Sequence, residues 1–389
     1  MKEKLLKIIL NPKYIFGVYL IIAVVTAVSK YLRGDYAINN YLIFKNVFFN
    51  TIHQKNLFVH YPELYFDLNH YGVFFSALIA PFAVMPDWLG ISLWNAANTF
   101  IFIYGIYKLP FSDAKKALFG LFCLQEYITA ALSLQFNVAL TGLLLLSAVY
   151  IYEKKEVKSV TAILVGVFVK IYGIVGLSQF FFIKNKLKFI LSGIAIAVIF
   201  FILPMAYSSP AFVVQCYSDW FRSIVEKNNE NQVLGNMQDI SLMGFFRRIL
   251  GDASISNLVF LAFGLPLFAA PYFRINQYRH YAFQLMILAS TLLFLVLFSS
   301  SSESPTYIIA VVGVMIWFFI QKERTPVVIG LLVFVIIFTC FSTSDLFPKF
   351  VKENYIIKYS LKAVPCIVIW LRVIYELLTK DFEKNYSLK

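Results

Sequence analysis

The sequence is poor in charged residues. Asp, Glu, Lys and Arg make up 14% of the 389 residues, whereas hydrophobic residues make up 60% and aromatic residues 18%. Soluble domains average about 25% charged residues, because charge supplies the solvated surface around their core. A chain with so little charge cannot cover a core of ordinary size, so the composition excludes an ordinary soluble protein.

Cysteine and the common catalytic motifs are also scarce. The four cysteines lie apart, without C-x-x-C or Cys/His spacing, which argues against a disulfide framework or a zinc site. The motifs G-x-x-x-x-G-K, G-x-G-x-x-G and H-E-x-x-H are absent. The hydrophilic segments 32–71 and 208–253 contain no D-x-D. We therefore expect neither a cofactor nor a metal ion.

Long apolar runs take the place of the missing charge. Each is close to the roughly 17–25 residues that a helix needs to cross hydrocarbon. Backbone polar groups in lipid must be satisfied within their own segment, so these runs should be helices. We predict an all-α polytopic membrane protein with about 10–12 membrane segments in a single domain over residues 1–389. The main runs are 14–31, 89–107, 117–132, 135–152, 189–207, 257–272, 281–299, 305–320, 326–342 and 359–379.

The formal net charge of +13 is spread over short basic clusters between the apolar runs. The positive-inside rule assigns such clusters to the cytoplasm. Membrane lipids, and not nucleic acid, are the partners that this pattern favours. Alternation of the helices then puts two long hydrophilic loops, 32–71 and 208–253, on the outer face, where we expect the functional site. The clusters are Lys2/Lys4/Lys7, Lys115/Lys116, Lys154/Lys155/Lys158, Lys184/Lys186/Lys188 and Lys322/Arg324.

The span 159–183 differs from the others, because basic clusters flank both ends and Lys170 lies in its middle. Each half is too short to cross a bilayer, which predicts a broken or re-entrant helix pair. An ionisable residue in an apolar span usually faces a cavity or a partner. Lys170 is therefore a candidate for holding a phosphate. The alternative is a lysine that only reaches lipid headgroups.

Two carboxylates are candidates for a general base. Asp35 directly follows the first predicted helix, at the level of the membrane surface. A base there would deprotonate a hydroxyl group beside a lipid-borne leaving group. Asp67 has aromatic neighbours and precedes the next apolar run. The alternative for each is a solvated loop acid.

Other polar candidates lie at predicted outer ends of helices. Arg247 and Arg248 are adjacent on a predicted surface helix, and guanidinium pairs suit phosphate or pyrophosphate. Simple headgroup contact is the alternative for both. Glu126, Gln135 and Asn137 cluster around the tip of a predicted helical hairpin, where they line a substrate cavity or are merely solvated. Glu303 lies where an outer loop meets a helix.

Several short motifs follow one another along the chain: Gly34-Asp35-Tyr36, Tyr71-Gly72-Val73-Phe74, Ala80-Pro81-Phe82, Leu93-Trp94-Asn95 with Asn98, Gln135-Phe136-Asn137, Lys170-Ile171-Tyr172, Asn236-Met237-Gln238, and Ser241-Leu242-Met243-Gly244 with Arg247. Taken in this order, they resemble the motifs of glycosyltransferase family 87. That family is polytopic, of the GT-C architecture, and related to polyprenyl-phosphate-mannose-dependent mannosyltransferases.

The resemblance implies an inverting, metal-independent transfer of a sugar, mannose or another hexose. The donor is a polyprenyl phosphate sugar and the acceptor a lipid or a glycan. Family members work at the periplasmic or exterior side of the bacterial inner membrane. Asp35 is the expected base, and the motifs add Tyr71, Asn236 and Gln238 to the substrate-binding set. If Asn40 instead occupies the family's acid position, then Asp67 or Glu303 must act.

Two other classes of function remain open. A transporter or lipid flippase explains the helices and Lys170, but it predicts polar residues along a path to the cytoplasm. In this chain the polar residues gather in the predicted outer loops. A non-catalytic subunit of an envelope complex is the second alternative. It predicts that replacing the loop acids one at a time leaves function intact.

Overall fold

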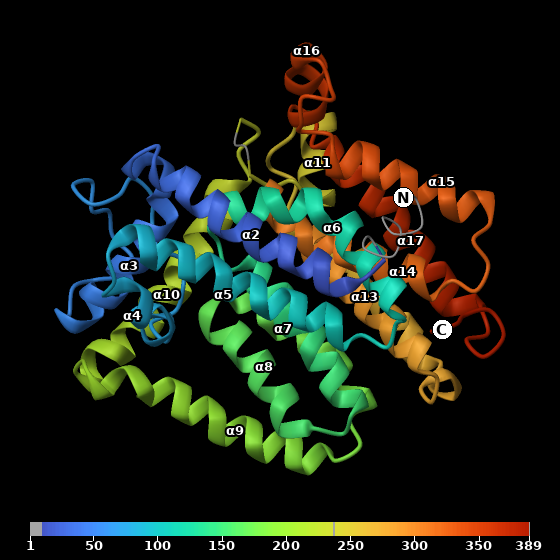
Figure 1. The fold of residues 1–389 in the computed structure, drawn as a ribbon, viewed down its shortest axis with the longest axis horizontal. Helices are drawn as coiled ribbons and strands as arrows, with labels where there is room; N and C mark the ends of the chain where they lie inside the picture. Colours follow the sequence, from blue (N-terminus) through green and yellow to red (C-terminus); the bar gives the residue numbers. More distant parts are fainter. Residues whose placement is uncertain (1–9, 236–237, 389) are drawn as a thin grey trace. The chain divides into compact units, whose positions relative to one another are not determined.

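The computed structural model describes residues 10–235 and 238–388, and Figure 1 traces them as a ribbon. Within these residues there is no strand, only an isolated antiparallel bridge between Gln321 and Tyr386. The all-α prediction is confirmed. The helices are α2 (Pro12–Tyr31), α3 (Asn39–Ile52), α4 (Phe75–Ala83), α5 (Asp87–Lys108), α6 (Asp113–Ser133), α7 (Asn137–Tyr152), α8 (Glu156–Val169), α9 (Lys186–Ile202), α10 (Pro210–Asn231), α11 (Leu242–Leu250), α12 (Asn257–Ala269), α13 (Tyr281–Leu297), α14 (Tyr307–Ile320), α15 (Pro326–Val335), α16 (Lys349–Val351) and α17 (Val364–Thr379).

Shorter 3-10 or π turns extend or connect these helices. They are η1 (Asp35–Ile38), η2 (Ile171–Phe182), η3 (Leu203–Ala206), η4 (Ala270–Phe273), η5 (Ile275–Gln277), η6 (Ser304–Thr306), η7 (Ile336–Cys340), η8 (Lys352–Ile357) and η9 (Leu361–Ala363).

Several helices are apolar along their whole length, as in a polytopic membrane protein. Within the described residues, three helical stretches are long and apolar enough to cross a membrane, namely α2, α5 and 186–206. Six further apolar helices are shorter, at 10–17 residues. An apolar helix satisfies its own backbone hydrogen bonds in lipid, which is why each run folds this way.

The two long hydrophilic segments are more helical than their composition suggests. The segment 32–71 contains η1 and α3, and 208–253 contains α10 and α11. The short run 72–85 forms α4, whose nine residues cannot cross a bilayer and whose interior contains Pro81.

The helix pair within 159–183 is broken at Lys170, as predicted. Lys170 has φ −140° and ψ 115°, an extended conformation between α8 and η2. The segments α8 and η2 pack against each other, and Gly166 and Gly173 lie at their contact. A Cβ atom built on Gly173 would lie 2.3 Å from the carbonyl carbon of Gly166 and 2.3 Å from the nitrogen of Val167. Only a residue without a side chain allows this close backbone approach.

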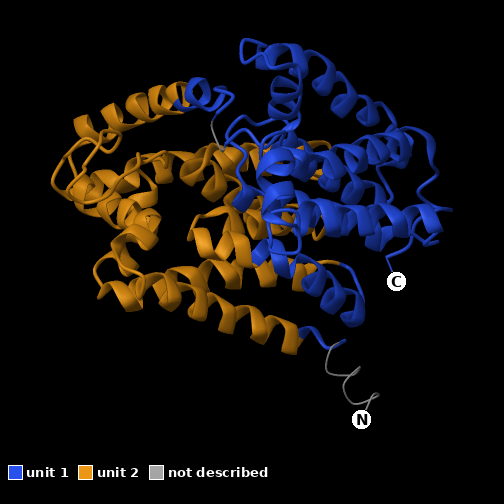
Figure 2. Cartoon of the chain, turned by 90° about the horizontal axis from the view of Figure 1, so that it is seen from above, with its two compact units in different colours: residues 1–12, 110–127, 227–389 blue, residues 13–109, 128–226 orange. Residues whose placement is uncertain are grey.

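The described chain divides into two compact units, shown in Figure 2. Unit 1 comprises residues 1–12, 110–127 and 227–389, and unit 2 comprises residues 13–109 and 128–226. In unit 1, α13 packs against α14 and α17, and every residue of α14 is buried. In unit 2, α7 packs against both α5 and α8. The single domain over residues 1–389 remains a prediction.

Replacing Gly173 with alanine should destabilise unit 2. Overpacking of this kind typically costs about 1–3 kcal/mol, because the backbone must move to admit the methyl group. Thermal unfolding in detergent would show a lowered melting temperature. Gly17→Ala in α2 is the matched control, since a Cβ there meets nothing within 4 Å. Equal melting temperatures for both variants would contradict the close approach.

Candidate functional site

The two candidate carboxylates of unit 2 lie on segments that pack together. Asp35 is the first residue of η1, and Asp67 lies in the loop between α3 and α4. Both residues are exposed. Their neighbours Tyr36 and Phe66 stack, with ring centroids 5.0 Å apart and planes 21° apart. The backbone nitrogen of Phe66 also donates to the Asn39 side chain at 2.9 Å. The structure thus brings the Asp35 and Asp67 segments side by side around an exposed aromatic pair.

Asn40 and Tyr71 both contact the turn between α6 and α7. The Asn40 amide nitrogen donates to the carbonyl oxygen of Ser133 at 2.8 Å. The Tyr71 hydroxyl accepts from the backbone nitrogen of Phe136 at 3.1 Å. Tyr71 is buried and stacks on Phe44, with centroids 4.8 Å apart. These side chains therefore fix the position of the turn that carries Gln135 and Asn137.

A polar cluster on that turn joins three of the predicted substrate-binding residues. Lys170 Nζ donates to Asn137 Oδ1 at 2.9 Å, and Asn137 Nδ2 donates to Gln135 Oε1 at 2.8 Å. The Lys170 ammonium also lies 4.8 Å from the centre of the Tyr172 ring. The Asn137 oxygen is neutral, so this contact does not cancel the ammonium charge. An ammonium group held in this way can hold a phosphate oxygen by a charge-assisted hydrogen bond.

Arg247 is directed into unit 1. Its side chain is 1% exposed, and Nη1 donates to Asp239 Oδ2 at 2.8 Å. Nε and Nη2 donate to the Ile255 carbonyl oxygen at 2.9 and 2.7 Å. Burial raises the pKa of the Asp239 carboxyl, against the opposing effects of the Ser241 hydroxyl and Arg247. The geometry gives Arg247 a role in holding the 239–257 segment together.

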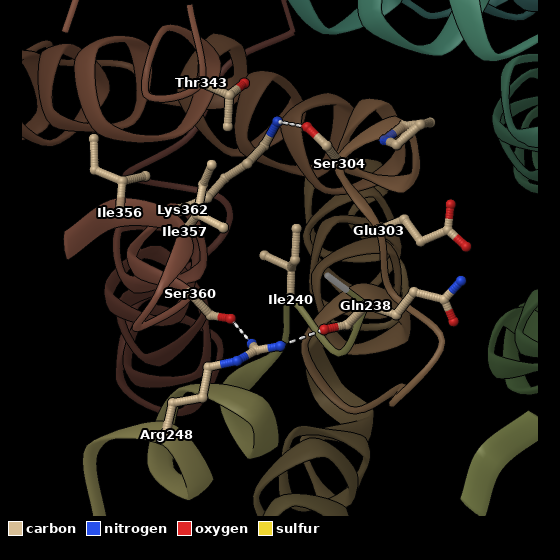
Figure 3. A pocket seen from close by; sticks show the side chains of 11 residues that line it. Gln238, Ile240, Arg248, Glu303, Ser304, Thr343, Ile356, Ile357, Ser360 and Lys362 are labelled. Carbon is tan, nitrogen blue, oxygen red and sulfur yellow. Dashed lines mark hydrogen bonds between the residues drawn. The ribbon is translucent and has the colours of Figure 1, made fainter. Parts of the chain in front are cut away.

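Arg248 lines a cavity of about 400 Å³ in unit 1, seen in Figure 3. Its guanidinium donates to the carbonyl oxygens of Gln238 and Asp239, at 2.5 and 2.9 Å, and to the hydroxyl of Ser360. Burial lowers the pKa of Arg248, and the nearby Asp239 carboxylate opposes that shift. Two predicted residues besides Arg248 line the cavity, namely Gln238 and Glu303. Predicted residue Asn236 lies outside the described residues.

Lys362, which also lines this cavity, forms a buried ion pair that the sequence interpretation missed. Lys362 Nζ donates to both carboxylate oxygens of Glu126, at 2.9 and 3.1 Å, and to Ser304 Oγ at 2.8 Å. Both charged side chains are at most 2% exposed. The sequence offers one signal, namely that an acidic and a basic residue lie in two separate apolar runs. Because a buried charge requires a partner, each of them predicts a group of opposite charge nearby. The sequence does not indicate that these two residues meet.

Glu303 lies at the edge of the same cavity and immediately before a helix. Its backbone nitrogen donates to the Thr306 hydroxyl at 3.3 Å, and its carbonyl oxygen accepts from the Thr306 nitrogen at 3.0 Å. These two hydrogen bonds hold the backbone of Glu303 in place at the start of η6. Figure 3 shows its side chain beside that of Gln238. A carboxylate and an amide at such a position suit the hydroxyl groups of a ligand.

The fold is that of a polytopic α-helical membrane protein. The model of glycosyltransferase family 87 matches residues 69–300. That range is more than half of the chain, so the protein belongs to glycosyltransferase family 87. No curated protein matches the chain. The matched range includes Lys170 and Arg248, whereas Asp35, Asp67 and Glu303 lie outside it.

Removing one partner of the Glu126–Lys362 pair should cost about 3–5 kcal/mol, because a buried charge is left without compensation. We expect both Glu126→Gln and Lys362→Met to lower the melting temperature strongly. The double variant should recover much of the loss, since neither charge remains. Lys349→Met is the control, because Lys349 is 82% exposed and pairs with Glu353 at 3.9 Å. Additive losses in the double variant would contradict the pairing.

Proposed function

We propose that this glycosyltransferase moves a hexose, such as mannose, from a polyprenyl phosphate donor to a lipid or glycan acceptor. The reaction takes place at the outer face of a bacterial inner membrane. The observation that carries the proposal is the Lys170–Asn137–Gln135 cluster, which lies within the family-matched range. It supplies a cation at a helix break in an otherwise apolar part of the chain.

The donor phosphate requires a cation when the sugar leaves. The bond between the anomeric carbon and the phosphate oxygen breaks, and the phosphate retains the electron pair. Lys170 stabilises the charge that develops on this oxygen. Gln135 and Asn137 orient the Lys170 ammonium through their hydrogen bonds. Because a phosphate leaves as an anion, the step needs no general acid.

The acceptor hydroxyl requires a base. Asp35, or alternatively Asp67, takes its proton while the hydroxyl oxygen bonds to the anomeric carbon from the face opposite the phosphate. The configuration therefore inverts. Both carboxylates are exposed to an entering acceptor, and the Tyr36–Phe66 pair between their segments offers an apolar surface to a sugar ring. Glu303 is the third candidate base.

The cavity of unit 1 is a second candidate site for a phosphorylated sugar. Arg248 offers a guanidinium to a phosphate, while Glu303 and Gln238 offer acceptors and donors to sugar hydroxyl groups. Arg247 positions Arg248 indirectly, because both guanidinium groups interact with Asp239 or its carbonyl oxygen. We therefore assign ligand contact to Arg248 and structural support to Arg247.

The base can be identified by replacing each acid separately. A general base typically contributes about 10²–10⁴-fold to the rate, so one of Asp35→Asn, Asp67→Asn and Glu303→Gln should lose that much turnover while still binding donor. The assay uses purified protein in nanodiscs, radiolabelled polyprenyl-phosphate-hexose and a membrane-lipid extract. Glu63→Gln is the control, an exposed acid of the same loop. Equal turnover in all variants would remove these acids from the mechanism.

Loss of the Lys170 charge should affect the leaving phosphate. We expect Lys170→Met to lower turnover about 10²–10³-fold, comparable to the loss of one preorganised transition-state donor, while Lys170→Arg retains part of it. The matched control is Lys158→Met, because Lys158 lies in α8 and is exposed. A Lys170→Met enzyme with normal turnover and donor affinity would exclude Lys170 as the phosphate ligand.

A further inference from the structure

A second cavity, of about 210 Å³, lies in unit 1 at the junction of α14, α15 and the C-terminal segment. It is formed by residues between the end of α14 and the start of α15, by the end of α17, and by residues 380–386. The residues important for its chemistry are Lys322, Glu323, Arg372, Glu376, Lys380 and Lys384. They belong to none of the candidate sites described above.

The C-terminal segment is fixed against the 320–322 segment by backbone hydrogen bonds. The nitrogen of Ser387 donates to the Ile320 carbonyl oxygen at 2.9 Å. The nitrogen of Lys322 donates to the Asn385 carbonyl oxygen at 3.3 Å. The isolated bridge between Gln321 and Tyr386 lies between these bonds. The wall that carries Lys384 therefore has a defined position.

The carboxylate of Glu376 forms the floor of this cavity. It is 2% exposed, and Oε2 accepts from Trp317 Nε1 at 3.1 Å, Gln321 Nε2 at 2.8 Å and the Tyr386 hydroxyl at 2.9 Å. Its Oε1 accepts from Arg372 Nε at 2.6 Å. Four donors thus satisfy Glu376. The bond from Arg372 uses Nε alone and leaves the terminal amino groups of this guanidinium for a ligand.

The charge of the lining favours an anion. Four basic residues and two acidic residues line the cavity, which gives an excess of two positive charges. Glu376 is already satisfied by its internal donors, and Lys380 is one of the basic residues of the lining. Guanidinium and ammonium groups converging on a small polar cavity are typical of phosphate sites. We propose that this cavity binds a phosphate group.

A phospholipid headgroup is the source that the surroundings favour. The helices that begin and end at the cavity, α15 and α17, expose apolar side chains next to it. Val327 is 61% exposed, and Leu371 and Tyr375 are each 49% exposed. Acyl chains would cover these side chains while the phosphate enters the cavity. The basic cluster Lys322/Arg324 assigns this side to the cytoplasm, whose leaflet carries anionic lipids.

Lipid titration of the full chain in detergent tests the proposal. Phosphatidylglycerol, phosphatidylcholine and inorganic phosphate are added separately, and bound lipid and melting temperature are measured. Phosphatidylglycerol should bind in preference to phosphatidylcholine. Lys380→Gln and Lys384→Gln should each weaken that binding about fivefold, the effect expected for one basic residue near a membrane surface. Among the described residues, Lys384 forms an ion pair with Asp381, at 3.9 Å.

Arg279→Gln is the matched control. Arg279 is 77% exposed and does not line the cavity, but it belongs to the same predicted cytoplasmic side. Unchanged affinity in Arg279→Gln would support a specific cavity. Equal weakening in all three variants, or no preference for phosphatidylglycerol, would overturn it in favour of diffuse attraction. A Lys380-dependent rise in melting temperature with inorganic phosphate alone would support the phosphate site and reject the lipid source.

Discussion

A charged side chain in an apolar helix must find its counter-group inside the protein, and much of this structure follows from that constraint. Moving an unpaired ion out of water costs several kcal/mol. In unit 1 the cost is met by pairing Lys362 with Glu126 at 2.9 Å, which ties the start of the last helix to α6. In unit 2 the chain leaves helical geometry at Lys170, whose ammonium reaches the amide oxygen of Asn137. Ionisable groups thus determine where helices break and where they join.

The cationic side chains discussed above are of two kinds, according to whether the group that they bind is charged or neutral. Lys362 and Arg247 bond to the carboxylates of Glu126 and Asp239, so their charge is largely compensated within the fold. Lys170 instead bonds to an amide oxygen, and Arg248 bonds to carbonyl and hydroxyl oxygens. Those neutral acceptors hold the two side chains in place. A leaving phosphate needs this second kind, a cation that is oriented before the charge develops.

Sequence alone predicted the parts of the fold that depend on local pattern. The apolar run 14–31 forms α2 and the run 89–107 forms α5. In both, the length of the run and the need to hydrogen-bond every backbone group within it determine a helix. The break at Lys170 was predictable for the same reason. The helix α10 was not, since half of its 22 residues are polar and no long apolar run marks it. In such segments, tertiary packing decides the conformation, and a single sequence carries little of that information.

The sequence indicated candidate residues for the site, but it did not indicate which of them contact one another. Asn137 and Lys170 are 33 residues apart, and Glu126 and Lys362 are 236 apart, so no spacing rule connects them. Arg247 and Arg248 are neighbours in sequence, yet successive residues of a helix point about 100° apart. One guanidinium is therefore buried against Asp239 while the other lines the cavity. Only Arg248 of the pair therefore faces the cavity, because helix geometry directs Arg247 into the fold.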